Sequence, residues 1–131
     1  MQREHVEAIA ALWADPDLPA FLAESVPDVD AWALRRLGSA GLEPQLLAVT
    51  ERHLYRITAG VEDGRRAFSF ERLPLRGMTV ALLEFRDDAV VRHRWKLRTR
   101  DEAFTVETEQ AAGDAPPALE RVMRLVLEHG D

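Results

Sequence analysis

The sequence predicts an α+β domain in which short helices precede an antiparallel sheet that a C-terminal helix closes. Apolar residues in the first third recur at helical spacing, and those in the last segment do so again. Between them, residues 46–109 alternate between apolar and polar with a period of two. Short turns separate the alternating stretches, which is typical of a meander of hairpins and therefore of an antiparallel sheet.

The chain has 131 residues, of which 47% are apolar and 31% charged, so we expect a single folded unit with its own core. Within it we distinguish a helical N-terminal extension, 1–45, packed on the domain, from a β-domain with a C-terminal helix, 46–131. The charge is uneven: 1–45 holds 3 basic and 8 acidic residues, 46–100 holds 12 and 7, and 101–131 holds 2 and 8. A basic middle between acidic ends fits either a polyanion site or mutual neutralisation on packing.

Two or three short helices are expected in the extension. The first has one apolar face, made of Val6, Ile9, Ala10 and Trp13. The segment "DPD" at 15–17 ends it, and a second short helix follows. In "DVDAWALRRLG", Asp28 as N-cap and Gly38 as C-terminal stop predict a third helix over 28–37.

Six strands are expected, at about 46–50, 53–59, 66–72, 78–86, 89–98 and 102–109. The loop from Gly60 to Gly64 and two-residue turns at Asp87-Asp88 and Arg100-Asp101 join hairpins. Asp114 is the expected cap of the closing helix, 116–129, whose apolar face carries Leu119, Val122, Met123 and Val126.

The segment "VVRHRWKLR", 90–98, places basic residues at alternate positions. A turn at Asp87-Asp88 puts His93 opposite Leu82 and Arg94 opposite Ala81. The turn at Arg100-Asp101 puts Glu107 and Glu109 beside the arginines. One face of the strand then enters the core with Val91, His93, Trp95 and Leu97, while the other points outward with Arg92, Arg94 and Lys96.

The outer face of this predicted sheet also carries an apolar strip, made of Ala81, Leu83 and Phe85. An exposed strip of this kind is usually covered. The acidic N-terminal helices, which would bring Glu4, Glu7 or Asp15 to the arginines, are one candidate cover, and a partner chain is the other. The partner-binding residues that we predict are Leu83, Phe85, Arg92, Arg94 and Lys96.

Two segments carry a family resemblance. "LLAVTERHLYRI", 46–57, resembles the opening hairpin of the bacterial pleckstrin-homology-like (PH-like) domains, and "FSFERLPL", 68–75, resembles their next strand. The order of the later strands and closing helix also resembles that fold, a curved seven-stranded barrel or sandwich closed by a C-terminal helix. The resemblance implies a non-enzymatic scaffold that binds proteins, peptides or lipids. Its lipid-binding loop would fall at 51–53, where no lysine-rich cluster stands.

The alternative is a small-molecule binder or small enzyme of the nuclear-transport-factor-2-like type. "LLEFRDDAVVRHRWKL", 82–97, also resembles the long bent hairpin of that fold. Its pocket would be lined by Glu84, His93, Trp95 and Phe104. A deep cavity containing Glu84 and His93 would favour this reading, whereas a closing helix plugged into the sheet favours the PH-like one.

Other function classes have little support in the sequence. The chain has no cysteine, and its four histidines share no metal-ligand spacing. The serines Ser25, Ser39 and Ser69 lie outside any nucleophile motif, and "GVEDGRR" at 60–66 lacks the end of a phosphate loop. A pI near 5.2 opposes nucleic-acid binding. We expect a cytoplasmic protein without membrane span, catalytic residue, metal or cofactor, whose partner is protein, including a second copy; contact with a lipid surface stays open.

Overall fold

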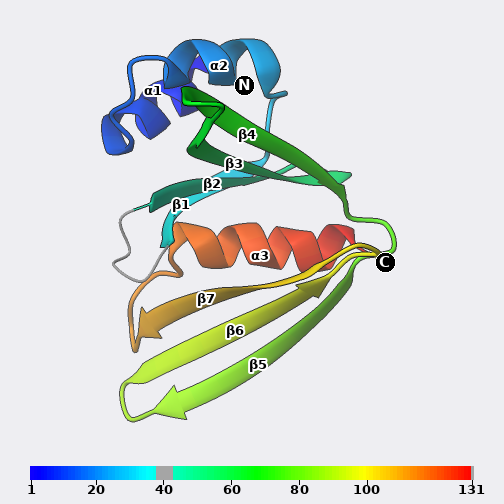
Figure 1. Cartoon of the computed structure of the whole chain (residues 1–131). Helices are drawn as coiled ribbons and strands as arrows, with labels where there is room; N and C mark the ends of the chain where they lie inside the picture. The colour runs from blue at the N-terminus through cyan, green and yellow to red at the C-terminus, as the bar shows by residue number, and fades with distance from the viewer. Residues whose placement is uncertain (38–42, 131) are drawn as a thin grey trace.

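The computed structural model describes residues 1–37 and 43–130, and it arranges them as two antiparallel sheets on either side of one helix (Figure 1). The order begins with α1 (Arg3–Leu12), α2 (Leu18–Ser25), β1 (Ala31–Leu37), β2 (Glu43–Val49), β3 (His53–Glu62) and β4 (Arg65–Pro74). It continues with β5 (Thr79–Asp87), β6 (Val90–Arg98), β7 (Ala103–Ala111) and α3 (Ala118–His129). The sheets have the strand orders β1-β2-β3-β4 and β5-β6-β7. The α+β class is confirmed, and of the expected barrel or sandwich the described strands form two separate sheets with no closed barrel.

Helix α3 lies between the sheets and supplies the centre of the main core. Its side chains Val122, Met123 and Val126 are fully buried, and Leu119 packs beside them, so the predicted apolar face is confirmed. They contact residues of both sheets, including Leu47, Leu54, Trp95, Leu97 and Val106. Burial of each such side chain contributes about 1.5–3 kcal/mol, which makes α3 the main link between the two sheets. The N-cap position is held by Pro117 rather than by the predicted Asp114.

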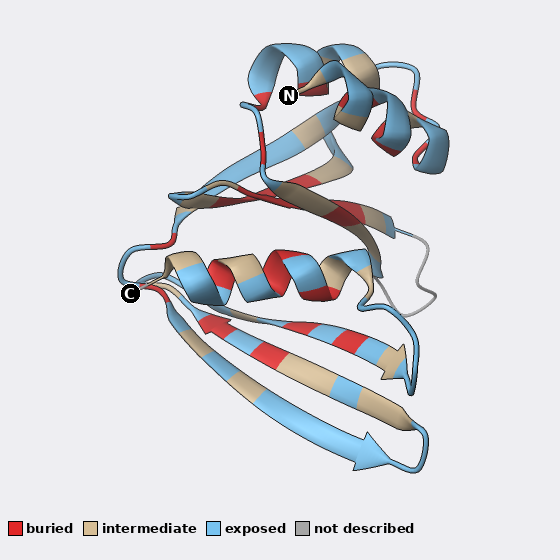
Figure 2. Ribbon diagram, turned by 180° about the vertical axis from the view of Figure 1, so that it is seen from behind, coloured by how far each residue is buried: buried red, intermediate tan, exposed pale blue. Residues whose placement is uncertain are grey.

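A second core lies on the opposite face of the four-stranded sheet, where α1 and α2 cover it (Figure 2). Ile9, Leu18 and Leu22 of the helices are fully buried there. They pack against side chains of β2 and β3, among them Leu46, Ala48, Tyr55 and Ile57. The four-stranded sheet is therefore covered on both faces along β2 and the first half of β3, whereas the three-stranded sheet meets α3 on one face only.

The predicted third helix over 28–37 is wrong, because Ala31–Leu37 forms strand β1. The strand pairs along its whole length with β2. Its side chains are divided between the two cores: Ala33 faces the α3 side, and Trp32 and Leu34 pack on the α1–α2 side. A strand with apolar side chains on both faces does not show the alternation of apolar and polar residues that predicts a strand. In "AWALRRL" the remaining signal was the helix propensity of Ala, Leu and Arg, which predicted a helix. The helical part of the N-terminal extension ends at Ser25, well before residue 45.

The six strands expected from the sequence are all present as β2 to β7. β3 and β4 extend further than expected, because the turn between them is the pair Asp63-Gly64. Both residues have positive φ, 52° and 74°, which suits a two-residue hairpin turn of the Asp-Gly type. The β6–β7 register is confirmed, with Arg94 opposite Glu107 and Arg92 opposite Glu109.

The β5–β6 register differs from the prediction by two residues. The turn is Asp88-Ala89 rather than Asp87-Asp88, so Glu84 lies opposite His93 and Leu83 opposite Arg94. An even shift preserves the face of every side chain, so the predicted inner and outer sets hold.

Strand β1, which the sequence did not predict, changes the place in the sheet of the loop that the family resemblance indicated. Residues 51–53 connect β2 to β3, so they do not form the first hairpin of the sheet. The β1–β2 connection, 38–42, which includes the predicted helix stop at Gly38, lies outside the described residues.

Candidate functional site

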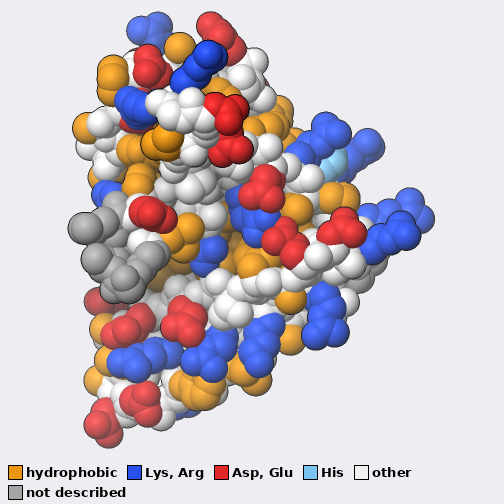
Figure 3. All heavy atoms as spheres, in the orientation of Figure 1, with side chains coloured by type: hydrophobic (Ala, Val, Ile, Leu, Met, Phe, Trp, Pro, Cys, Tyr) orange, Lys and Arg blue, Asp and Glu red, His pale blue; other side chains and the backbone are white. Residues whose placement is uncertain are grey.

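The outer face of the three-stranded sheet gathers all five residues that the sequence predicted as partner-binding. Strand β5 contributes Leu83 and Phe85, and strand β6 contributes Arg92, Arg94 and Lys96. The two apolar side chains are 40% and 42% exposed, large fractions for Leu and Phe. Figure 3 shows the basic side chains in a row across this sheet, with hydrophobic and acidic ones next to them.

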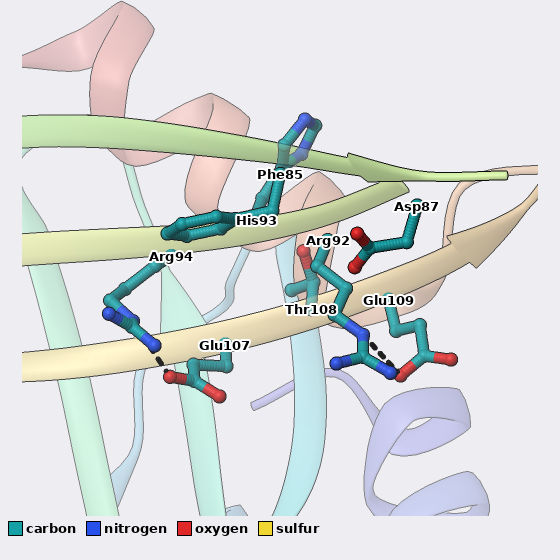
Figure 4. A pocket seen from close by; sticks show the side chains of 8 residues that line it. All are labelled: Phe85, Asp87, Arg92, His93, Arg94, Glu107, Thr108 and Glu109. Atoms are coloured by element: carbon teal, nitrogen blue, oxygen red, sulfur yellow. Dashed lines mark hydrogen bonds and ion pairs between the residues drawn. The ribbon is translucent and has the colours of Figure 1, made fainter. Parts of the chain in front are cut away.

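The arginines of this face are paired with carboxylates of β7. Arg94 lies 2.9 Å from Glu107 and Arg92 lies 3.4 Å from Glu109 (Figure 4). The guanidinium of Arg94 also stacks over Phe85, 5.2 Å from the ring centroid. Exposed pairs of this kind contribute about 0–1 kcal/mol each, so they fix the direction of the side chains more than they stabilise the fold. Together these groups line a shallow hollow of about 490 Å³.

The expected cover of this face by the N-terminal helices is wrong. Helices α1 and α2 pack on the far side of the other sheet (Figure 1). Asp15 accordingly forms an ion pair with Arg66 of β4, and Glu7 pairs with Arg3 of its own helix. The outer face of β2 and β3 offers several fully buried apolar side chains to these helices, whereas that of β5 to β7 offers one strip among charges. The apolar strip of Ala81, Leu83 and Phe85 is therefore exposed to solvent in the folded chain.

A cluster of polar side chains lies on the inner side of the same sheet, around Glu120 of α3, which is 3% exposed. One carboxylate oxygen accepts hydrogen bonds from His93 at 2.7 Å and Arg124 at 3.1 Å. The other accepts from the Trp95 indole at 3.1 Å and the Thr108 hydroxyl at 2.5 Å. The four donors satisfy a buried carboxylate completely, as burial of a charge requires.

His93 continues the cluster to the surface. Its second ring nitrogen lies 2.9 Å from Glu84, whose proximity the sequence predicted. Each ring nitrogen of His93 therefore lies within hydrogen-bond distance of a glutamate carboxyl group. Sequence reasoning missed Glu120 and Thr108. The apolar face of α3 concealed the glutamate, and the threonine resembled any other strand residue.

The electrostatics of the cluster favour ionised carboxylates. Burial raises the pKa of Glu120, but hydrogen bonds from Thr108, His93 and Trp95 outweigh it, so the net pKa lies below the ordinary value. The hydrogen bonds from His93 and then Arg86 also lower the pKa of Glu84.

The alternative pocket residues Glu84, His93, Trp95 and Phe104 lie on the inner face, where Arg124 of α3 packs against Trp95 and Arg56 of β3 packs against Phe104. Trp95 is fully buried, and Glu120 of α3 joins it to His93. Arg56 stacks over Phe104 at 4.6 Å. A hollow of about 310 Å³ remains beside the cluster, lined by residues that include His93, Gln110, Arg121 and Arg124.

Among the described residues, no group of three or more His, Asp or Glu side chains is placed to hold a metal ion. None of the described helices is long and apolar enough to cross a bilayer. Comparisons of the chain with protein-family models, with curated proteins and with solved structures found no match.

Proposed function

We propose that this protein is a PH-like binding or assembly module that docks a protein partner on the outer face of β5 to β7. The observation that carries the proposal is the exposure of Leu83 and Phe85 in a face whose counterpart on the other sheet is covered. Exposed apolar side chains between paired charges are typical of protein interfaces, which combine an apolar centre with a polar rim.

The seven antiparallel strands, in sheets of four and three with a helix after the last strand, support the PH-like part of the proposal. Helix α3 fills the space between the sheets with Val122, Met123 and Val126, which supports a scaffold that binds at its surface. The fold alone implies no catalytic residue set, so the function is argued from the exposed face.

Arginine and aromatic residues are enriched at protein interfaces, and Arg94 stacked on Phe85 presents both in one place. The neighbouring pair of Arg92 and Glu109 is exposed on both sides, so a partner can rearrange it at little cost. The residue opposite Lys96 on β7 is the uncharged Thr105. The ammonium group of Lys96 is therefore available to a carboxylate of the bound protein.

The test combines Leu83→Asp with Phe85→Asp and compares the variant with the wild type in affinity purification from source cells, followed by light scattering of the purified protein. The matched control is Val61→Asp, since Val61 is also an exposed apolar strand residue, but on the four-stranded sheet. We expect loss of the recovered partner or of self-association in the double variant only. Equal recovery and equal mass for all three proteins would refute the proposal, provided that thermal unfolding shows that all three are folded.

A further inference from the structure

Strand β5 is an open edge of the three-stranded sheet. It pairs with β6 on one side, and in the described structure no strand lies on its other side. Figure 2 shows β5 as a largely exposed strand at the rim of the molecule. An edge strand presents unpaired backbone donors and acceptors that can pair with another chain, so proteins usually protect it.

The other three edges have protection. At the β7 edge, Arg35 of β1 donates a hydrogen bond to the backbone oxygen of Thr105 at 2.9 Å, and both strands carry charged residues, Arg35 and Arg36 on β1 and Glu107 and Glu109 on β7. At the β4 edge, Phe21 of α2 stacks on Phe68 at 5.0 Å, and Pro74 ends the strand. Charged and proline residues are the usual guards of an edge. β5 carries its charged residues, Glu84, Arg86 and Asp87, in its second half, whereas every side chain from Val80 to Leu83 is apolar.

We propose that β5 pairs antiparallel with β5 of a second copy, with the twofold axis at Leu83. This inference rests on the proposed function and names its partner. The two three-stranded sheets would then form one continuous six-stranded sheet. Closed twofold pairing of identical edges is a common way to form a dimer, because each copy contributes the same surface.

The sequence of β5 is complementary to itself in this register. All nine residues of Thr79–Asp87 pair when Leu83 lies on the axis. On the outer face Leu83 meets Leu83 of the partner subunit, and Ala81 meets Phe85 of the partner subunit. On the inner face no residue lies opposite a side chain of like charge, because Leu82 faces Glu84 and Val80 faces Arg86 in the other copy.

Neighbouring registers are poorer. An axis at Glu84 places two carboxylates opposite one another, which is unfavourable. An axis at Phe85 leaves only residues 83–87 paired, and one at Leu82 leaves 79–85. The axis at Leu83 therefore combines the longest pairing with a continuous apolar strip across both copies.

The experiment uses the absence of cysteine from the chain, which makes any introduced thiol the only one. Directly opposite residues of an antiparallel pair have Cα atoms about 4.5–5.5 Å apart, within the range of a disulfide. Leu83→Cys should therefore form a disulfide-linked dimer under mild oxidation. Ala81→Cys should not crosslink to itself, because its copies lie about 14 Å apart, but a mixture of Ala81→Cys and Phe85→Cys should.

The matched control is Arg94→Cys on the same outer face, one strand further in, where the two thiols would lie about 14 Å apart across three strand spacings. Light scattering of the wild type should show a mass that rises towards twice 14.8 kDa with protein concentration. Crosslinking at position 94 but not at 83, or crosslinking of Ala81→Cys with itself, would overturn the edge pairing and leave outer-face docking intact. A wild type that stays monomeric at high concentration would also overturn it, while partner recovery through Leu83 and Phe85 would still support the proposed function.

Discussion

The buried carboxylate of Glu120 is the most informative position to perturb, because four donors from four residues converge on it. Glu120→Gln keeps the shape of the side chain but removes its charge and replaces one oxygen with an NH₂ group. That group would point at two donors on either side, His93 with Arg124 or Trp95 with Thr108. At least one buried donor then loses its acceptor in either orientation.

The expected cost follows from these contacts. An unsatisfied buried donor costs about 1–3 kcal/mol, and loss of charge assistance weakens the remaining bonds. The substitution also removes the negative charge that lies 2.7 Å from His93 Nδ1. We expect the free energy of unfolding to fall by about 2–4 kcal/mol, and Tm by roughly 6–15 °C for a chain of this size.

Equilibrium unfolding in urea, followed by tryptophan fluorescence, measures the change. The control is Glu107→Gln, which removes an exposed carboxylate that is paired with Arg94 and should change the free energy of unfolding by no more than about 1 kcal/mol. A double-mutant cycle of Glu120→Gln with Thr108→Val should give a coupling free energy, because the two residues share a hydrogen bond. If Glu120→Gln cost no more than Glu107→Gln, the cluster would not be a stabilising link between α3 and the sheet.

Two further outcomes can be measured with the same assay. The pKa of Glu120 is lower in the folded state than its ordinary value near 4.5, so the folded state binds fewer protons between the two values. The wild type should therefore lose stability as the pH falls below about 4.5, more steeply than Glu120→Gln; parallel curves would contradict the assignment. Arg56 is buried and forms ion pairs with Glu71 and Glu102. Arg56→Lys should cost about 1–2 kcal/mol, since one ammonium cannot replace a planar group that bridges two carboxylates, whereas Arg3→Lys at an exposed pair should be neutral.

Much of the β-domain was predictable from the sequence, because its alternation reflects burial on one face. Strands β5 to β7 have one face on α3 and one in water, so apolar and polar residues alternate along β6 and β7. The turn at Arg100-Asp101 gave the correct partners for Arg92 and Arg94. The apolar spacing of α3 was equally clear, because one face of that helix enters the core.

The errors have physical causes of the same kind. β1 is covered on both faces and so has no alternation, and its Ala, Leu and Arg residues favour helix when tertiary contacts are ignored. The β5–β6 turn moved by one residue because Asp88 adopts a positive φ of 51°, which an Asp can do in a tight turn. Periodicity could not show which sheet the N-terminal helices cover, because the outer faces of both sheets carry apolar residues.

The candidate site was predictable in part for a related reason. Alternation along a strand determines on which face of the sheet each side chain lies. The outward placement of Leu83, Phe85 and the basic residues was therefore correct despite the register error. Contacts between segments far apart in the sequence do not follow from alternation. Glu120 lies 27 residues from His93, and nothing in the helical pattern of α3 marks it as the acceptor for a strand.

The two outer faces of the molecule differ in how far their apolar side chains are covered. On the four-stranded sheet, α1 and α2 bury the apolar side chains of β2 and of the first half of β3. On the three-stranded sheet, the pairs Arg94–Glu107 and Arg92–Glu109 join β6 to β7, and Arg94 also stacks over Phe85 of β5, yet Leu83 and Phe85 stay 40% and 42% exposed. Exposed ion pairs of this kind contribute about 0–1 kcal/mol each. The apolar side chains Leu83 and Phe85 beside them stay partly in contact with water in the single chain. In the dimer that we propose, covering Leu83 and Phe85 would remove their apolar area from water, and pairing of β5 with its copy would satisfy the backbone groups at the open edge.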